Sequence, residues 1–241
     1  MRDLEYPVTD AELASIGILL TSNNTPQSPS RELPPLDLES ILFKICVCLQ
    51  RNKWNGRLAS ALGTWFQLHG DRVFVDRLCT YRERFCEEYG EDVYWLRYFA
   101  FFNTFLRRHS WKRLTMAMPG EAGKREYYFG SDASTARMFI DRWGLEVFLP
   151  PNCKIKVHRN ALRIRESDVL GRKALMQSNL QYANRFRYGS NVRSDVATFM
   201  ESGYFRSAYD LSKFLCLSRE SVRKNWADME LYAEVERSKS I

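Results

Sequence analysis

The spacing of apolar side chains constrains the fold more than any other feature of this 241-residue chain. Between positions 38 and 49, large aliphatic residues recur at steps of three and four, which places them on one face of a helix. The same pattern predicts further helices over 57–68, 73–89, 92–108, 134–143 and 169–187. Gly70, Gly90 and Gly189 follow three of these segments, as is common at helix C-termini. The expected fold class is therefore mainly α.

The chain is expected to divide into four parts. Residues 1–35 form a flexible N-terminal segment, because 21–35 is rich in Ser, Asn, Thr and Pro. Residues 36–149 form an N-terminal helical domain, with the most apolar helix, 92–108, at its centre. Residues 150–189 contain a small basic β-hairpin and a connecting helix, and residues 190–241 form a C-terminal domain. With 45% apolar residues, the chain can bury one large core or two small ones.

The positive charge is concentrated in the C-terminal part of the chain. Residues 1–149 hold 19 Lys and Arg against 19 Asp and Glu, whereas residues 150–241 hold 17 against 10. The whole net charge of +7 therefore lies in the second part, and ten of its basic residues fall within 154–193. This asymmetry indicates a polyanion as partner, because Lys and Arg that neutralise phosphates release counterions.

Two short runs in this basic region alternate apolar and basic residues: KIKVHR over 154–159 and ALRIRE over 161–166. Alternation with a period of two is typical of a strand with one face in solvent, so the runs predict a small hairpin. Its outward face would carry four basic side chains: Lys154, Lys156, Arg163 and Arg165. The pattern leaves open whether this face binds DNA or is only solvated.

The C-terminal domain has the pattern of three short helices. Ser207 precedes the second helix and Asp210 follows three residues later, a combination that favours a helix start. A turn at 216–218 separates the second helix from the third, and Ser218 is placed to cap the third. The third helix is then expected to bury three side chains: Val222, Trp226 and Met229.

The residues around this turn resemble the pattern of helix-turn-helix DNA-binding proteins. A small residue is followed four positions later by a turn residue, and then by an aliphatic residue, a serine, a small residue and a valine. The matching positions are Ser212, Cys216, Leu217, Ser218, Ser221 and Val222. Cys216 stands where these proteins usually have glycine, and Ser212 where they usually have alanine. Cys216 is therefore expected to be mildly strained in a left-handed turn conformation.

Over about 185–231 the chain also resembles winged-helix transcriptional regulators, including some that are encoded beside nucleotidyltransferase-type toxins. The resemblance implies a repressor or autoregulator, and it makes 190–241 a helix-turn-helix DNA-binding domain. Only twelve residues follow Met229, too few for the two strands of a complete wing, although 231–235 is expected to supply one. Two alternatives stay open for the basic hairpin: it replaces the wing, or it belongs to a separate winged unit.

The expected DNA contacts follow from the burial of Val222 and Trp226, which turns the opposite side of the third helix outward. The residues expected at the groove are Ser218, Arg219, Glu220, Ser221 and Arg223. Arg219 and Arg223 are the candidates for reading base edges, and Glu220 is expected to accept from cytosine or to orient Arg223. The residues expected to contact phosphates are Arg193, Arg206, Ser207, Tyr209 and Lys224.

These features predict a protein that binds double-stranded DNA in a sequence-specific manner and acts as a transcriptional repressor or autoregulator. We expect a homodimer, because one helix in one groove covers too few base pairs. The alternative is a protein–protein interaction module, such as an antitoxin or adaptor, whose helix-turn-helix is accessory. The N-terminal helical domain would then bind the protein partner. A cytoplasmic protein without a membrane segment is expected, because the sequence lacks an apolar stretch of about 20 residues and a secretory signal.

We expect neither an enzyme nor a cofactor or metal. The sequence lacks a glycine-rich phosphate loop, H-E-x-x-H and G-x-S-x-G. Its six cysteines contain no C-x2-C pair and are expected to be small buried apolar residues. His69 is expected to be a favourable charge at a helix end. A nuclease site assembled from scattered carboxylates stays open.

Overall fold

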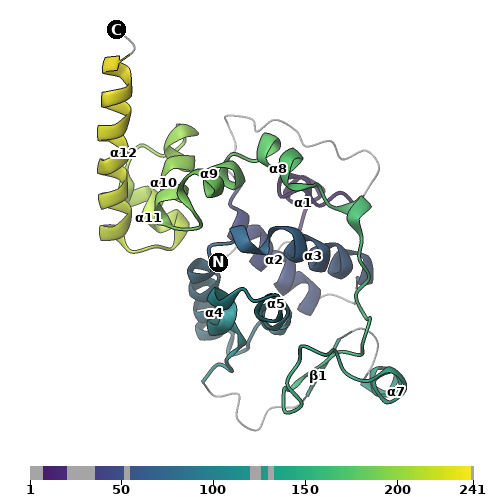
Figure 1. The fold of residues 1–241 in the computed structure, drawn as a ribbon. Helices are drawn as coiled ribbons and strands as arrows, with labels where there is room; N and C mark the ends of the chain where they lie inside the picture. The colour runs from purple at the N-terminus through teal and green to yellow at the C-terminus, as the bar shows by residue number, and fades with distance from the viewer. Residues whose placement is uncertain (1–7, 21–35, 52–54, 120–125, 130–132, 240–241) are drawn as a thin grey trace.

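The computed structural model describes residues 8–20, 36–51, 55–119, 126–129 and 133–239 (Figure 1). Twelve α-helices lie in these ranges: α1 Asp10–Ser15, α2 Leu38–Arg51, α3 Gly56–His69, α4 Val75–Tyr89, α5 Tyr94–Phe105, α6 Lys112–Thr115, α7 Ala133–Trp143, α8 Arg172–Ser178, α9 Leu180–Tyr188, α10 Val192–Glu201, α11 Ala208–Leu215 and α12 Arg219–Lys239. Two strands, β1 Tyr127–Tyr128 and β2 Ile155–Lys156, pair in parallel. The predicted mainly helical fold class is confirmed.

The larger of two apolar cores lies among α2, α3, α4 and α5. Trp65 and Phe66 of α3 and Trp95 and Phe99 of α5 are at most 2% exposed. The rings of Phe66 and Phe99 lie 4.9 Å apart, a separation at which aromatic pairs attract each other. The aromatic residues of α5 therefore form the centre of the core, as the sequence predicts for 92–108. None of the helices in the described ranges combines the length and the apolar character that crossing a bilayer requires.

Residues 8–20, which the sequence assigns to a flexible segment, pack into this core. Thr9 and Glu12 form a reciprocal capping box at the start of α1, and Lys44 donates to Glu12 at 2.7 Å. Ile16 and Ile18 are fully buried. The prediction of flexibility is therefore wrong for 8–20, because local caps and apolar burial hold this piece. Residues 21–35, whose polar composition is the basis of the predicted flexible segment, lie outside the described residues.

The predicted basic β-hairpin is not formed. β2 pairs with β1 rather than with 161–166, which has no strand. The backbone amides of Arg163 and Arg165 donate instead to Ser60 Oγ and Thr64 Oγ1 of α3, at 3.2 and 2.9 Å. Hydroxyls on α3 thus satisfy backbone donors that a partner strand would otherwise satisfy. The alternation correctly indicated the inward residues of the first run, where Ile155 and Val157 are buried, but not those of the second, where Leu162 is half-buried and Ile164 is 68% exposed.

Two other expectations fail for local reasons. The helix expected over 169–187 is divided into α8 and α9, because the Asn179 side chain accepts the Tyr182 amide at 2.7 Å and starts a new helix. The strand expected at 231–235 is part of α12, which continues for 21 residues. Met229 to Glu236 consists largely of strong helix formers and contains neither Gly nor Pro, so nothing stops the helix there.

His69 is not a charged group at a helix end. Its side chain is fully buried, with Nδ1 2.7 Å from the Tyr182 hydroxyl and Nε2 2.9 Å from the Leu170 carbonyl. Because a carbonyl only accepts, Nε2 carries the proton and Nδ1 accepts from Tyr182. Burial lowers the pKa of His69 to about 4 despite the Leu170 hydrogen bond, so the ring is neutral at pH 7.

Candidate nucleic-acid interface

The last three helices form a compact unit with a core of its own. Val196 and Phe199 of α10, Leu211 and Leu215 of α11, and Val222 of α12 are fully buried against one another. Met229 is buried as well, and Trp226 is half-buried with its indole N–H donated to Glu230 at 2.7 Å. The inward face predicted for α12 is confirmed, and burial of this face fixes which side chains of α12 face solvent.

The caps and the turn of this unit have the geometry that the sequence predicts. Ser207 and Ser218 each accept a backbone amide three residues later, from Asp210 at 3.1 Å and from Ser221 at 3.2 Å. Cys216 adopts the left-handed conformation, with φ 56° and ψ 35°. A non-glycine residue in this region carries a cost, because its Cβ approaches the following carbonyl. The α11–turn–α12 segment therefore has a sharp, capped turn of three residues.

The first two turns of α12 present polar side chains to solvent. Arg219, Glu220, Arg223 and Lys224 are exposed, as is Ser218 before them, whereas Ser221 is half-buried. The Arg219 guanidinium lies 5.1 Å from the centre of the Tyr209 ring, a cation–π distance that orients it. Lys213 lies 4.2 Å from the same ring and is also exposed. Lys213 was not among the predicted contacts, although its i, i+4 spacing from Tyr209 on α11 is a usable signal.

The residues predicted to contact phosphates differ in exposure and in whether their polar groups already bond within the chain. Arg193 and Arg206 are exposed at the N-terminal sides of α10 and α11. Ser207 is half-buried, and its hydroxyl donates to the Asp210 carboxylate at 2.7 Å. Its single donor is therefore used inside the chain, and Ser207 acts as a cap rather than as a free phosphate ligand.

The structure does not bring the basic segment 154–165 to α12. Figure 1 shows β1 and α7, the neighbours of this segment, on the far side of the body from α12. Lys156 lies 3.5 Å from the Glu126 carboxylate and Arg165 3.9 Å from the Asp168 carboxylate. Lys154 is half-buried. Arg163 has an exposed side chain, and its backbone amide donates to Ser60 of α3. The hypothesis that this segment stands in the place of a wing beside α12 is therefore wrong.

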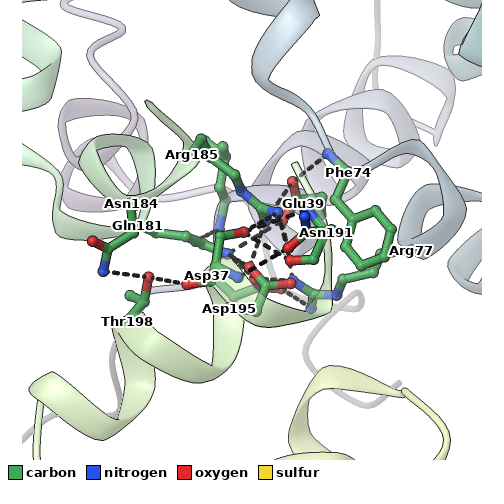
Figure 2. A network of polar contacts seen from close by, with 12 residues as sticks. Asp37, Glu39, Phe74, Arg77, Gln181, Asn184, Arg185, Asn191, Asp195 and Thr198 are labelled. Atoms are coloured by element: carbon green, nitrogen blue, oxygen red, sulfur yellow. Dashed lines mark hydrogen bonds and ion pairs between the residues drawn. The ribbon is translucent and has the colours of Figure 1, made fainter. Parts of the chain in front are cut away.

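One basic residue that contributes to the predicted charge excess is inside the fold. Arg185 is fully buried, and it donates to Glu39 of α2 and to Asp195 of α10. Gln181, one turn earlier on α9, donates to Asp195 at 2.9 Å and to Asp37 at 3.1 Å. These contacts form the network in Figure 2, which joins helices from the two cores.

Arg77 of α4 completes this network and contacts the backbone next to the turn between α11 and α12. Its two terminal nitrogens each donate to one oxygen of Asp37 at 2.6 Å, a bidentate ion pair. Its Nε donates to the Leu215 carbonyl at 3.2 Å, directly before the turn. Arg84, two turns further along α4, has a terminal nitrogen 2.7 Å from Cys216 Sγ. The body therefore fixes the orientation of α12 from both α10 and the turn.

The network holds three carboxylates and two guanidinium groups, so one negative charge is in excess. Burial raises the pKa of Glu39 to about 7; Arg185 opposes this and nearby Asp195 adds to it. Burial acts in the same direction on Asp37, but Arg77 outweighs it and holds the pKa of Asp37 below its usual value. Protonation of Glu39 alone would leave two charges of each sign, which is the favourable arrangement in a medium of low dielectric.

The charged residues of the network are shielded from solvent. Its residues Asp37, Glu39, Arg77, Arg185 and Asp195 are at most 4% exposed. Two surface hollows, of about 560 and 210 Å³, are lined by other residues, between α4 and 113–119 and beside α3 and α5. None of the five network residues lines either hollow. The network joins the two cores through buried ion pairs and hydrogen bonds.

The described residues contain no group of three or more His, Cys, Asp or Glu side chains placed to hold a metal ion. All six cysteines are free thiols; Cys46, Cys79 and Cys153 are buried, whereas Cys48, Cys86 and Cys216 are half-buried. Comparison of the chain with protein-family models, with curated proteins and with solved structures found no match.

Proposed function

We propose that this protein binds double-stranded DNA in a sequence-specific manner, with the first two turns of α12 in the major groove. The observation that carries the proposal is the separation of α12 into a buried side, Val222 and Met229, and an exposed side with Arg219, Arg223 and Lys224. The major groove admits a helix in this way, with residues at its N-terminal end against base edges.

Each exposed side chain has a role in this proposal. Arg219 and Arg223 are one turn apart, and an arginine that donates two hydrogen bonds to guanine is the most common specific contact. Glu220 lies between them in sequence and accepts from cytosine or orients Arg223. Lys213 and Tyr209 flank Arg219 and, with Lys224, contact phosphates, which sets affinity and orientation but carries no sequence information.

The regulatory role that we propose is that of a repressor or autoregulator. A protein that occupies DNA without catalytic groups acts by excluding or recruiting other proteins. The body of helices α2–α5 then determines how the helix-turn-helix is presented, because the buried network and Arg77 hold it rigidly. An adaptor role without DNA is the second candidate, and it predicts no dependence on Arg219 or Arg223.

The proposal is tested by selecting bound duplexes from a random pool at two salt concentrations. A DNA-binding protein of this kind yields an enriched sequence at both, and its overall affinity falls steeply as salt rises. A pool that stays random at both concentrations would reject sequence-specific binding. Binding without enrichment would leave only a non-specific electrostatic interaction.

A further inference from the structure

The distal half of α12 exposes apolar side chains in the described part of the chain. Met229 is the last buried residue, and the described side chains from 230 to 238 are exposed. Leu231, Tyr232 and Val235 are 62%, 55% and 45% exposed. Figure 1 shows this part of α12 projecting from the body. Isolated helices of about ten residues are marginal in water, so a helix with this composition is expected to be covered.

Successive residues on an α-helix are about 100° apart, which places the side chains of α12 in three sectors. Val222 and Met229 face the body. Arg219 and Arg223 point about 70° and 110° away from that direction, and Leu231 and Val235 lie about a third of a turn beyond them. The apolar arc thus faces neither the body nor the proposed DNA surface.

We propose that the distal half of α12 pairs antiparallel with α12 of a second copy of this chain, through Leu231, Tyr232 and Val235. In such a pair the two-fold axis passes between the helices, perpendicular to their common plane, near position 233. The axis leaves the direction perpendicular to that plane unchanged, so side chains that lie on one side of the plane in one copy lie on the same side in the other copy. Arg219 and Arg223 of both copies therefore face one side, and the two bodies lie on the other.

The length of the helix supports the choice of a second copy over other partners. Positions 219–223 are centred twelve residues before the axis, which corresponds to about 18 Å at 1.5 Å per residue. The two groove ends are then about 36 Å apart along the pair, and half-sites one turn of DNA apart are separated by about 34–36 Å. This step rests on the proposed function, because only DNA binding makes that spacing meaningful.

The area of the apolar arc determines how strong the pair is. Three partly exposed side chains bury on the order of 300 Å² per copy, whereas a stable interface buries about 800 Å² per partner. The pair is therefore weak in solution, and DNA completes it by holding two copies at high effective concentration. Cooperative binding to a two-half-site duplex follows.

The test compares two double variants of α12 that each add two glutamates one turn apart. L231E/V235E places them on the apolar arc. The control A233E/R237E places them on the opposite side of the same exposed turns, which is also the side of Arg219, so it serves as the control for the sedimentation assay. Both sets lie beyond the last buried residue, so folding is expected to be unaffected, which circular dichroism and urea unfolding check. Sedimentation at millimolar protein concentration, without DNA, should show dimers for the wild type and the control and monomers for L231E/V235E.

The second readout is DNA binding. On a duplex with two half-sites one turn apart, L231E/V235E should lose about 100-fold in affinity together with cooperativity, and it should bind a single half-site like the wild type. A wild type that remains monomeric in sedimentation, an L231E/V235E variant that matches the control in sedimentation, or an L231E/V235E variant that binds the two-half-site duplex like the wild type would overturn the pairing. Absence of DNA binding by every form would reject the proposed function only, because sedimentation still decides the pairing.

Discussion

Removal of the Arg185 guanidinium is expected to destabilise the protein far more than removal of an exposed arginine on the same helix. Arg185→Met keeps most of the apolar stem but leaves Glu39 and Asp195 with Arg77 as their one remaining cation in the network. Loss of one partner of a buried ion pair costs about 3–5 kcal/mol, because the remaining charge has no water to replace it. Domains are typically stable by about 5–15 kcal/mol, so this loss is a large fraction of the total.

Arg187→Met is the matched control, because Arg187 lies one residue from the end of α9 and is 63% exposed. Its guanidinium is 3.9 Å from Glu201, and an exposed pair of this kind contributes about 0–1 kcal/mol. Urea unfolding followed by circular dichroism gives the free energy of unfolding of both variants. Equal, small losses for Arg185→Met and Arg187→Met would refute the view that the network stabilises the joint.

A double-mutant cycle separates the ion pair from simple packing. Asp195→Leu alone is expected to be destabilising, because it leaves Arg185 with only Glu39 as a charged partner. In Arg185→Met/Asp195→Leu, both charges of the pair are gone and the remaining carboxylates, Asp37 and Glu39, still have Arg77. The double variant should therefore lose less stability than the two single variants together. Additive losses would show that the two residues do not interact energetically.

Three further results are expected. The pKa of Glu39 is raised from 4.5 to about 7, so its contribution to stability is present below pH 4.5 and is lost, by about 3 kcal/mol, as pH rises to 7. The difference in free energy of unfolding in urea between wild type and Glu39→Gln should therefore change between pH 4.5 and 7. A difference that is constant with pH would contradict the assignment. Cys216→Gly should raise the free energy of unfolding by about 0.5–1 kcal/mol, because glycine adopts φ 56° without strain. A lower free energy of unfolding would mean that the contact between Arg84 and the Cys216 sulfur stabilises the turn more than the strain destabilises it. Lys213→Ala should weaken binding to all duplexes equally and reduce the salt dependence, whereas altered sequence preference would place Lys213 at a base.

Much of the fold could be predicted because its signals are local. Helical spacing predicted α2–α5, and serine caps with a small-residue turn predicted α11 and α12. The failures have identifiable causes. Asn179 competes for a backbone amide and divides one helix, and hydroxyls of α3 capture amides that were assigned to a hairpin. Asn179 lies within the segment that it divides, and asparagine is a favoured helix N-cap, so that signal was local. The α3 hydroxyls lie about 100 positions from the amides that they accept, so the second failure has no local signal.

The buried network is the largest feature that sequence reasoning missed. Its carboxylates and guanidinium groups come from α2, α4, α9 and α10, so no motif brings them together in the sequence. One signal was available: Glu39 is three residues before Leu42 on the apolar face of α2, where a charge must be paired. Arg185 was instead counted as surface charge, which a net-charge argument cannot distinguish from a buried ion. The exposed residues of α12, by contrast, follow directly from helical spacing.

The role of α12 is tested most directly by measuring how single variants discriminate between a selected duplex and duplexes with one base pair changed. Arg219→Ala and Arg223→Ala are compared with Arg237→Ala, an exposed arginine at the other end of the same helix. Arg219→Ala and Arg223→Ala should each lose about 1–3 kcal/mol of discrimination at the base pair that the missing arginine contacts, whereas Arg237→Ala should discriminate like the wild type. Discrimination that survives in both Arg219→Ala and Arg223→Ala would contradict the assignment of α12 to the groove.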